Sequence, residues 1–185
     1  MRQPVLPDLL RPGLRLVFCG TAAGPTSARL GQYYARPGNR FWEMLHRSGL
    51  TPERLRPADY ARVLDYGIGL TDVVKHASGL DRDLDPEHLG EGAREALQAR
   101  VTAVAPDVLA FTSKRAALAG LGEVAGYGEQ PQRWATTRLW VLPSPSGSAR
   151  RWWDEAPWLA LGRAVRGGNS LPLHGGGSGW GRSER

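Results

Sequence analysis

The sequence predicts an α/β fold in which a short, mainly parallel sheet of four strands carries helices on both faces. Short apolar runs alternate along the chain with longer segments in which apolar residues recur every three or four positions. Such alternation is typical of parallel strands connected by helices. The chain has 185 residues, of which 41% are hydrophobic, and this is enough for one domain with one core.

Four apolar runs are the predicted strands, and the segments between them have helical spacing. The clearest helix is expected over residues 85–105, where Asp85 is suited to cap the first turn and Pro86 to begin it. Apolar residues then recur along one face of that segment. The predicted strands cover residues 14–19, 63–73, 108–112 and 139–142, and the other predicted helices cover residues 39–48, 113–121 and 150–165.

The composition changes near residue 166. Residues 1–166 are predicted to form a single domain. The remaining residues, 167–185, are rich in glycine and serine. A segment with so little apolar surface to bury is expected to be disordered.

Basic residues are concentrated at the two ends of the chain. The formal net charge is +6, with seven arginines against two acidic residues in 1–50 and seven against three in 138–185. The middle of the chain is acidic, with ten basic and thirteen acidic residues. A basic surface built from both ends indicates a polyanionic partner such as nucleic acid, although a genomic bias toward arginine would give the same composition.

Candidate site residues follow the predicted strands, because ligands of an open parallel sheet bind beyond the carboxyl ends of its strands. The first strand leads into a loop between Gly20 and Gly24, where Thr21 is the one polar side chain. Asp72 lies at the carboxyl end of the second, and it is either an active-site carboxylate or a helix cap. After the fourth, residues 143–147 combine two prolines with two serines, whose hydroxyls suit phosphate or sugar.

Each candidate also has a purely structural interpretation. The segment from Gly20 to Gly24 matches neither a P-loop nor a dinucleotide fingerprint, and it is alternatively a simple turn from strand to helix. Tyr34 either stacks on a flat base or packs on the neighbouring helix. His76, four residues beyond Asp72, is the reserve candidate for an acid or base.

Four motifs along the chain resemble those of one enzyme family. The segments LRLVFCGTAAGPTSA, ARPGNRFW, YGIGLTDVV and WVLPSPSG together resemble the mismatch-specific uracil/thymine-DNA glycosylases of the uracil-DNA glycosylase superfamily. The resemblance runs from about residue 14 to residue 165 without large gaps. It implies a three-layer α/β/α sandwich that flips uracil out of a G·U pair and cleaves its N-glycosidic bond, without a metal ion or cofactor.

The resemblance also implies roles for individual residues. Backbone groups of the first loop would hold the edge of uracil, Tyr34 would stack on its face, and Asn39 would begin the helix that supports the loop. The implied uracil-binding residues are Gly20, Thr21, Ala22, Ser27, Tyr34 and Asn39. A wedge loop would enter the minor groove and fill the space left by the flipped base. Its residues are Ser144, Ser146, Gly147, Ser148 and Arg150.

Two positions depart from the family pattern. Relatives usually carry an asparagine that positions the hydrolytic water where this chain has Ala22. They also usually begin the wedge loop with an asparagine, where this chain has Ser144. The catalytic group expected in the first loop is therefore absent.

Three functions are compatible with these departures. In the first, the enzyme is active, and Asp72 orients or deprotonates water or stabilises an oxocarbenium-like sugar. In the second, the protein is a catalytically weak module that binds mismatched or single-stranded DNA. In the third, it is a small-molecule enzyme that uses the same pocket.

The favoured prediction is a monofunctional glycosylase of base excision repair. Its partner would be double-stranded DNA that contains a G·U mismatch, with single-stranded DNA as a further candidate and no membrane. We expect a monomer in the cytoplasm that is associated with the nucleoid through DNA.

Overall fold

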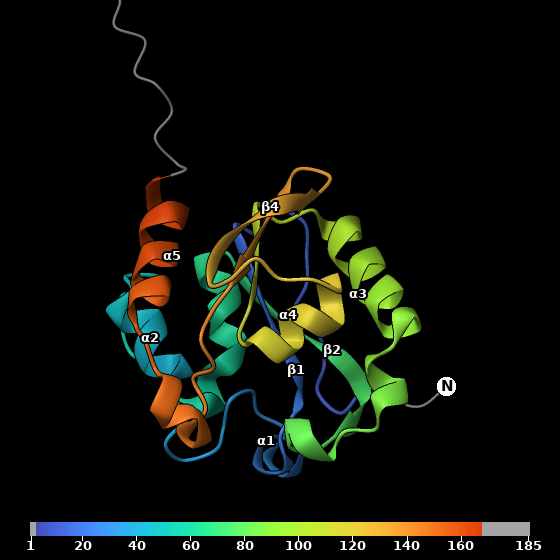
Figure 1. The fold of residues 1–185 in the computed structure, drawn as a ribbon. Coiled ribbons are helices and arrows are strands. Elements are labelled where there is room, and N and C mark those ends of the chain that lie inside the picture. Colours follow the sequence, from blue (N-terminus) through green and yellow to red (C-terminus); the bar gives the residue numbers. More distant parts are fainter. Residues whose placement is uncertain (1–2, 168–185) are drawn as a thin grey trace, which may run out of the picture.

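The computed structural model describes residues 3–167 and contains one mixed sheet of five strands in the order β2-β1-β3-β5-β4 (Figure 1). All neighbouring strands are parallel except the pair of β4 and β5. The predicted α/β sandwich is therefore confirmed, with five strands in place of four. The strands are β1 (Leu16–Ala23), β2 (Ile68–Ser78), β3 (Val108–Phe111), β4 (Gly128–Trp134) and β5 (Thr137–Val141).

Helices cover both faces of the sheet. Helices α2 and α5 lie on one side and α3 lies on the other (Figure 1). The α-helices are α1 (Pro25–Leu30), α2 (Phe41–Arg47), α3 (Glu91–Val104), α4 (Lys114–Leu121) and α5 (Ala156–Gly167). Four segments are 3₁₀ helices: η1 (Pro57–Tyr66), η2 (Asp81–Asp83), η3 (Pro86–Leu89) and η4 (Gly147–Trp152).

The interior strand β1 contributes side chains to two apolar cores, one on each face of the sheet. Leu16 and Phe18 pack in the core beneath α2 and α5, whereas Val17 and Cys19 pack in the core beneath α3 and α4. Successive side chains of a strand point to opposite faces. A strand covered on both faces therefore appears in the sequence as a continuous apolar run.

Strand β4 was not predicted because its sequence, GEQPQRW, contains no apolar run. Gln130 is its one fully buried residue. The Gln130 side chain accepts a hydrogen bond from Ala125 N and donates to the carbonyls of Gly126 and Gly128. Pro131 is tolerated because β4 lies at the edge of the sheet.

The prediction of one strand over residues 63–73 is wrong. Residues up to Tyr66 belong to η1, and Gly67 then adopts a φ of 70°. This left-handed conformation favours glycine and ends the helical turn. Strand β2 begins only at Ile68 and continues to Ser78, so the apolar run is divided between a helical segment and a strand.

Two predicted helices are each divided into a 3₁₀ helix followed by an α-helix. The Asp85 carboxylate accepts a hydrogen bond from Glu87 N at 3.0 Å, as expected of a cap, but it begins η3, and Gly90 separates η3 from α3. The Asp154 carboxylate accepts a hydrogen bond from Ala156 N at 2.9 Å. Helix α5 therefore begins afresh after η4 rather than continuing from residue 150.

An N-terminal segment covers the outer edge of β2. Leu9 and Leu70 exchange backbone hydrogen bonds of 2.9 and 3.1 Å, and Val5 N donates to Lys75 O at 2.7 Å. Such pairing prevents an edge strand from forming hydrogen bonds with the strands of other chains. The same pairing places Asp8 against β2, although the sequence around Asp8 shows no strand pattern.

No helix within the described residues has the length and apolar character needed to span a bilayer. The tail predicted to be disordered, 167–185, lies outside the described residues except for Gly167, the last residue of α5.

Helices α2 and α5 pack closely at Gly162, and this contact yields a prediction for stability. A Cβ atom on Gly162 would lie 2.2 Å from Ser48 O. We expect Gly162→Ala to lower the free energy of unfolding by about 1–3 kcal/mol, because the helices must separate. Urea titration measures this change. Gly92→Ala, in α3 with open space around it, is the control, and equal midpoints for the two variants would contradict the prediction.

Candidate active site

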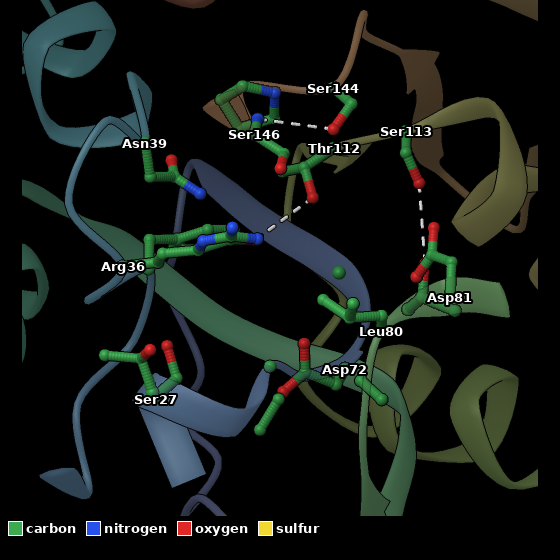
Figure 2. A pocket seen from close by; sticks show the side chains of 18 of the residues that line it. Ser27, Arg36, Asn39, Asp72, Leu80, Asp81, Thr112, Ser113, Ser144 and Ser146 are labelled. Carbon is green, nitrogen blue, oxygen red and sulfur yellow. Dashed lines mark hydrogen bonds between the residues drawn. The ribbon is translucent and has the colours of Figure 1, made fainter. Parts of the chain in front are cut away.

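A cavity of about 430 Å³ lies at the carboxyl edge of the sheet, over β1 and β2 (Figure 2). Three connecting segments border it, within residues 33–39, 79–82 and 144–149. Ten of the twelve site residues predicted from the sequence border it, and Gly147 and Arg150 do not. The ten are Gly20, Thr21, Ala22, Ser27, Tyr34, Asn39, Asp72, Ser144, Ser146 and Ser148.

The segment after Cys19 is not a loop, as the sequence had indicated. Strand β1 continues through Ala23, with Gly20 paired to Asp72 and Ala22 paired to Val74. Asp72 therefore lies within β2 and not at its end. Strand β3 ends at Phe111, which pairs with Cys19, so β1 and β2 extend beyond β3 and form the floor of the cavity.

Asp72 is a buried carboxylate in this cavity, with 4% of the residue exposed. A Cβ atom on Gly20 would lie 2.6 Å from Asp72 Oδ1, 3.3 Å from the Tyr34 hydroxyl and 3.7 Å from Thr112 Oγ1. Three polar side chains thus converge on the Cα of Gly20. A residue without a side chain is needed here because these groups fill the space that a Cβ would take.

Burial raises the pKa of Asp72 to about 6, because the buried site solvates the charged form poorly. Lys75 and Arg100 oppose this rise, and Asp8 adds to it. A carboxyl whose pKa lies near neutrality can hold or release a proton at physiological pH. Such a group in a cavity is a candidate for acid–base chemistry.

Tyr34 presents an aromatic ring to the cavity from an unusual backbone conformation, with a φ of 52°. The ring stacks on Phe41, with centroids 3.8 Å apart and an angle of 15° between the planes. Its hydroxyl lies 3.1 Å from Thr112 Oγ1. Burial and the neighbouring Asp72 raise the pKa of Tyr34 well above its ordinary value, so the hydroxyl stays neutral.

Ser27 and Asn39 fix the segment that carries Tyr34. Ser27 Oγ accepts a hydrogen bond from Ala35 N at 3.1 Å, so this hydroxyl has a structural partner. Asn39 Oδ1 accepts a hydrogen bond from Phe41 N at 2.9 Å, which agrees with its predicted place at the start of the helix. The Asn39 amide also extends toward the cavity (Figure 2).

The predicted wedge loop packs against the segment before α2. Arg40 N donates a hydrogen bond to Pro145 O at 2.9 Å, and Arg36 Nη1 donates one to Ser148 Oγ at 3.3 Å. At the base of the loop, the buried indole of Trp158 donates a hydrogen bond to Pro143 O at 3.0 Å. The loop is therefore anchored in the core beneath α5 and joined to the Arg36 segment at its tip.

Sequence reasoning missed Asp81, a carboxylate on the wall formed after β2. Asp81 borders the cavity beside Thr21. Burial raises the pKa of Asp81, whereas the hydrogen bond from Thr21 and the charge of Arg115 lower it. Thr21 Oγ1 also lies 3.5 Å from Ser113 Oγ. The acidic residues that follow β2 were the one feature of the sequence that could have identified Asp81 as a site residue. However, the turn that brings them back to the cavity has no sequence pattern.

His76, the reserve candidate for an acid or base, does not border this cavity. Its Nδ1 lies 3.4 Å from Gln3 O, on the N-terminal segment. Within residues 3–167, no three His, Cys, Asp or Glu side chains are grouped so that they could hold a metal ion.

The chain was compared with known families and structures. The model of the uracil DNA glycosylase superfamily matches residues 7–162. A solution NMR structure from Methanosarcina acetivorans, described as a "putative Uracil DNA glycosylase", has 23% sequence identity and a TM-score of 0.59. The match covers 89% of this chain and 98% of that one, and it supports the same fold. Because the superfamily model spans most of the sequence, the chain belongs to the uracil DNA glycosylase superfamily.

Proposed function

We propose that this protein is a DNA repair glycosylase that flips uracil out of G·U mismatches and hydrolyses its N-glycosidic bond, leaving an abasic site. The observation that carries the proposal is Asp72, a carboxylate with 4% of the residue exposed. It lies in a cavity whose lining includes small residues, hydroxyls, the Tyr34 ring and the charged side chains of Arg36, Asp81 and Arg82. Superfamily membership supports DNA as the substrate. An enzyme that acts on this bond must take the nucleotide out of the duplex, because a stacked base is inaccessible.

The cavity offers a flat surface and polar groups to an extruded base. One face of the Tyr34 ring is covered by Phe41, and we propose that the base stacks on the remaining exposed part of the ring. The backbone near Thr21 and Ala22 would meet the edge of uracil, whose carbonyl and N–H groups pair with backbone donors and acceptors. The amide of Asn39 supplies a further hydrogen-bonding group on the wall.

In the proposed reaction, ionised Asp72 accepts a proton from a water molecule. The water oxygen forms a bond to C1′ of the sugar, the bond between C1′ and N1 breaks, and its electron pair stays on uracil N1. The negative charge of Asp72 also stabilises the positive charge that develops on the sugar. This assigns to Asp72 the role that an asparagine at position 22 has in relatives, from the neighbouring strand.

The wedge loop is proposed to enter the duplex and occupy the space of the flipped base. It borders the cavity through Ser144, Ser146 and Ser148, and η4 adds Arg150 close to this rim. Filling the gap offsets the cost of unstacking, a few kcal/mol per step. The positively charged arginine side chains of the protein attract DNA phosphates, and the affinity for DNA depends on this attraction.

A second candidate function is binding without efficient cleavage, and Ala22 favours it. Ala22 borders the cavity but offers only a methyl side chain where relatives carry a catalytic amide. A module of this kind would bind mismatched or single-stranded DNA and release no uracil. An assay for free uracil with G·U, A·U and single-stranded substrates separates the two functions and defines the preferred context.

The first prediction concerns the carboxylate. We expect Asp72→Asn to slow uracil release from a G·U duplex by about 10²–10⁴-fold, the usual contribution of a positioned acid or base. Single-turnover release of free uracil measures the rate, and a thermal melt verifies that the variant is folded. A rate equal to that of the wild type would remove Asp72 from the mechanism.

The second prediction concerns pH. Because the pKa of Asp72 is about 6, the carboxyl is mostly protonated below this pH and mostly ionised above it. The proposed reaction needs the ionised form, so the single-turnover rate should rise with pH and level off above an inflection near pH 6. A rate that falls as pH increases through this range would indicate that the protonated form is active.

The third prediction tests the close approach at Gly20. In Gly20→Ala, the new methyl group would displace Asp72 Oδ1, which lies 2.6 Å from the Cβ position. Displacements of about 1 Å cost on the order of 10²-fold in rate. We expect such a loss in uracil release. Gly92→Ala, distant from the cavity, serves as the matched control, and wild-type activity in Gly20→Ala would show that the carboxylate position is not critical.

A further inference from the structure

Two cations lie beside Asp72, and both are engaged by another carboxylate. Lys75 Nζ is 2.7 Å from Asp8 Oδ1, and Arg100 Nε is 3.2 Å from Asp8 Oδ2. Arg100 also donates a hydrogen bond at 2.8 Å to the backbone carbonyl of Asp72. Within residues 3–167, neither cation forms an ion pair with the Asp72 carboxylate.

The N-terminal segment holds Asp8 in this position. Its backbone pairs with Leu70 and Lys75 on either side of Asp72 along β2. Asp8 Oδ1 also accepts a hydrogen bond of 2.8 Å from Thr71 Oγ1. The Asp8 side chain is 22% exposed and that of Lys75 is 8% exposed, so the pair is largely shielded from water.

The phenol and thiol groups near Asp72 are uncharged at neutral pH. Tyr33 accepts a hydrogen bond from Lys75 Nζ at 3.3 Å, and burial raises the pKa of its hydroxyl. Burial likewise raises the pKa values of Tyr34 and of the Cys19 thiol on β1. The charges that act on the Asp72 carboxyl are those of Lys75 on β2, Arg100 on α3 and Asp8 on the N-terminal segment. The charged residues Arg36, Asp81 and Arg82 also border the cavity.

We propose that Asp8 is a positioning residue that neutralises Lys75 and Arg100 and so keeps Asp72 basic enough to accept a proton from water. The inference rests on the proposed function of Asp72. Without Asp8, two positive charges beside Asp72 would lack their counter-ion and would stabilise its ionised form. A carboxylate stabilised in this way holds a proton less strongly and is a weaker general base.

The test combines two variants that change opposite charges. We expect Asp8→Asn to lower the pKa of Asp72 by about half a pH unit or more, and Lys75→Gln to raise it by a similar amount. Carbon-13 NMR titration of protein labelled at aspartate measures this value directly. The acid limb of single-turnover uracil release from a G·U duplex should shift in the same direction as the NMR midpoint in each variant. Asp65→Asn, an exposed residue of η1, is the matched control.

The outcomes separate this inference from the proposed function. Opposite shifts for the two variants support the inference, because a purely structural disturbance would not invert with the sign of the removed charge. Shifts in one direction, or none beyond that of Asp65→Asn, overturn it. If Asp8→Asn does not fold, Lys75→Gln alone decides by whether the NMR midpoint rises. If wild-type protein releases no uracil, the proposed function fails, while the titration still reports the coupling of Asp8 to Asp72.

Discussion

The Asp72 carboxylate lies against the Cα of Gly20, and the architecture around this contact provides the space, the burial and the charge balance that it needs. Strands β1 and β2 must pair beyond the end of β3 for the two residues to meet. Glycine is required because Asp72, Tyr34 and Thr112 all approach its Cα. The small residues after Cys19, which in the sequence appeared to lack chemistry, leave room for a carboxylate supplied by the adjacent strand.

Keeping a carboxylate in such a place is costly, and the surrounding structure supports it. A buried charge without compensation is strongly disfavoured. Here the compensation is partial: the cations on β2 and α3 favour the charged form of Asp72, but both are paired with Asp8, and burial still raises the pKa of Asp72 to about 6. The strained backbone of Tyr34 is held by stacking on Phe41 and by the hydrogen bonds of Ser27 and Asn39. Strain of this kind persists where neighbouring contacts fix it, commonly at functional sites.

Much of the fold could be predicted from local sequence patterns. Strands β1, β3 and β5 are buried on both faces, and that burial requires the apolar runs that reveal them. Strand β4 has a single fully buried residue, so its pattern carries no comparable signal. The run over residues 63–73 was misinterpreted because apolar residues continue from η1 into β2, and only the backbone of Gly67 marks the boundary.

The site was predictable to the extent that it follows the ends of strands. The serine loop follows β5, and Asp72 lies on β2 just beyond the end of β3, so both reach the carboxyl edge of the sheet where ligands bind. Asp8 and Asp81 were missed for a different reason. Asp8 reaches Lys75 through pairing between distant parts of the chain, and Asp81 returns to the cavity through a short 3₁₀ turn. Neither the pairing of distant segments nor a short irregular turn leaves a periodic signal in the sequence.

The hydrogen bond from the Trp158 indole to Pro143 O has a consequence for motion. It ties the first residue of the serine loop to a fully buried side chain of α5, whereas η4, farther along, is a kinked 3₁₀ turn with no fully buried residue. Local opening occurs where few contacts are buried. The loop can therefore loosen and re-form from its distal end while its base stays in register with the core. If the loop enters DNA as proposed, each encounter with a base pair would disturb one short turn and leave the two apolar layers intact.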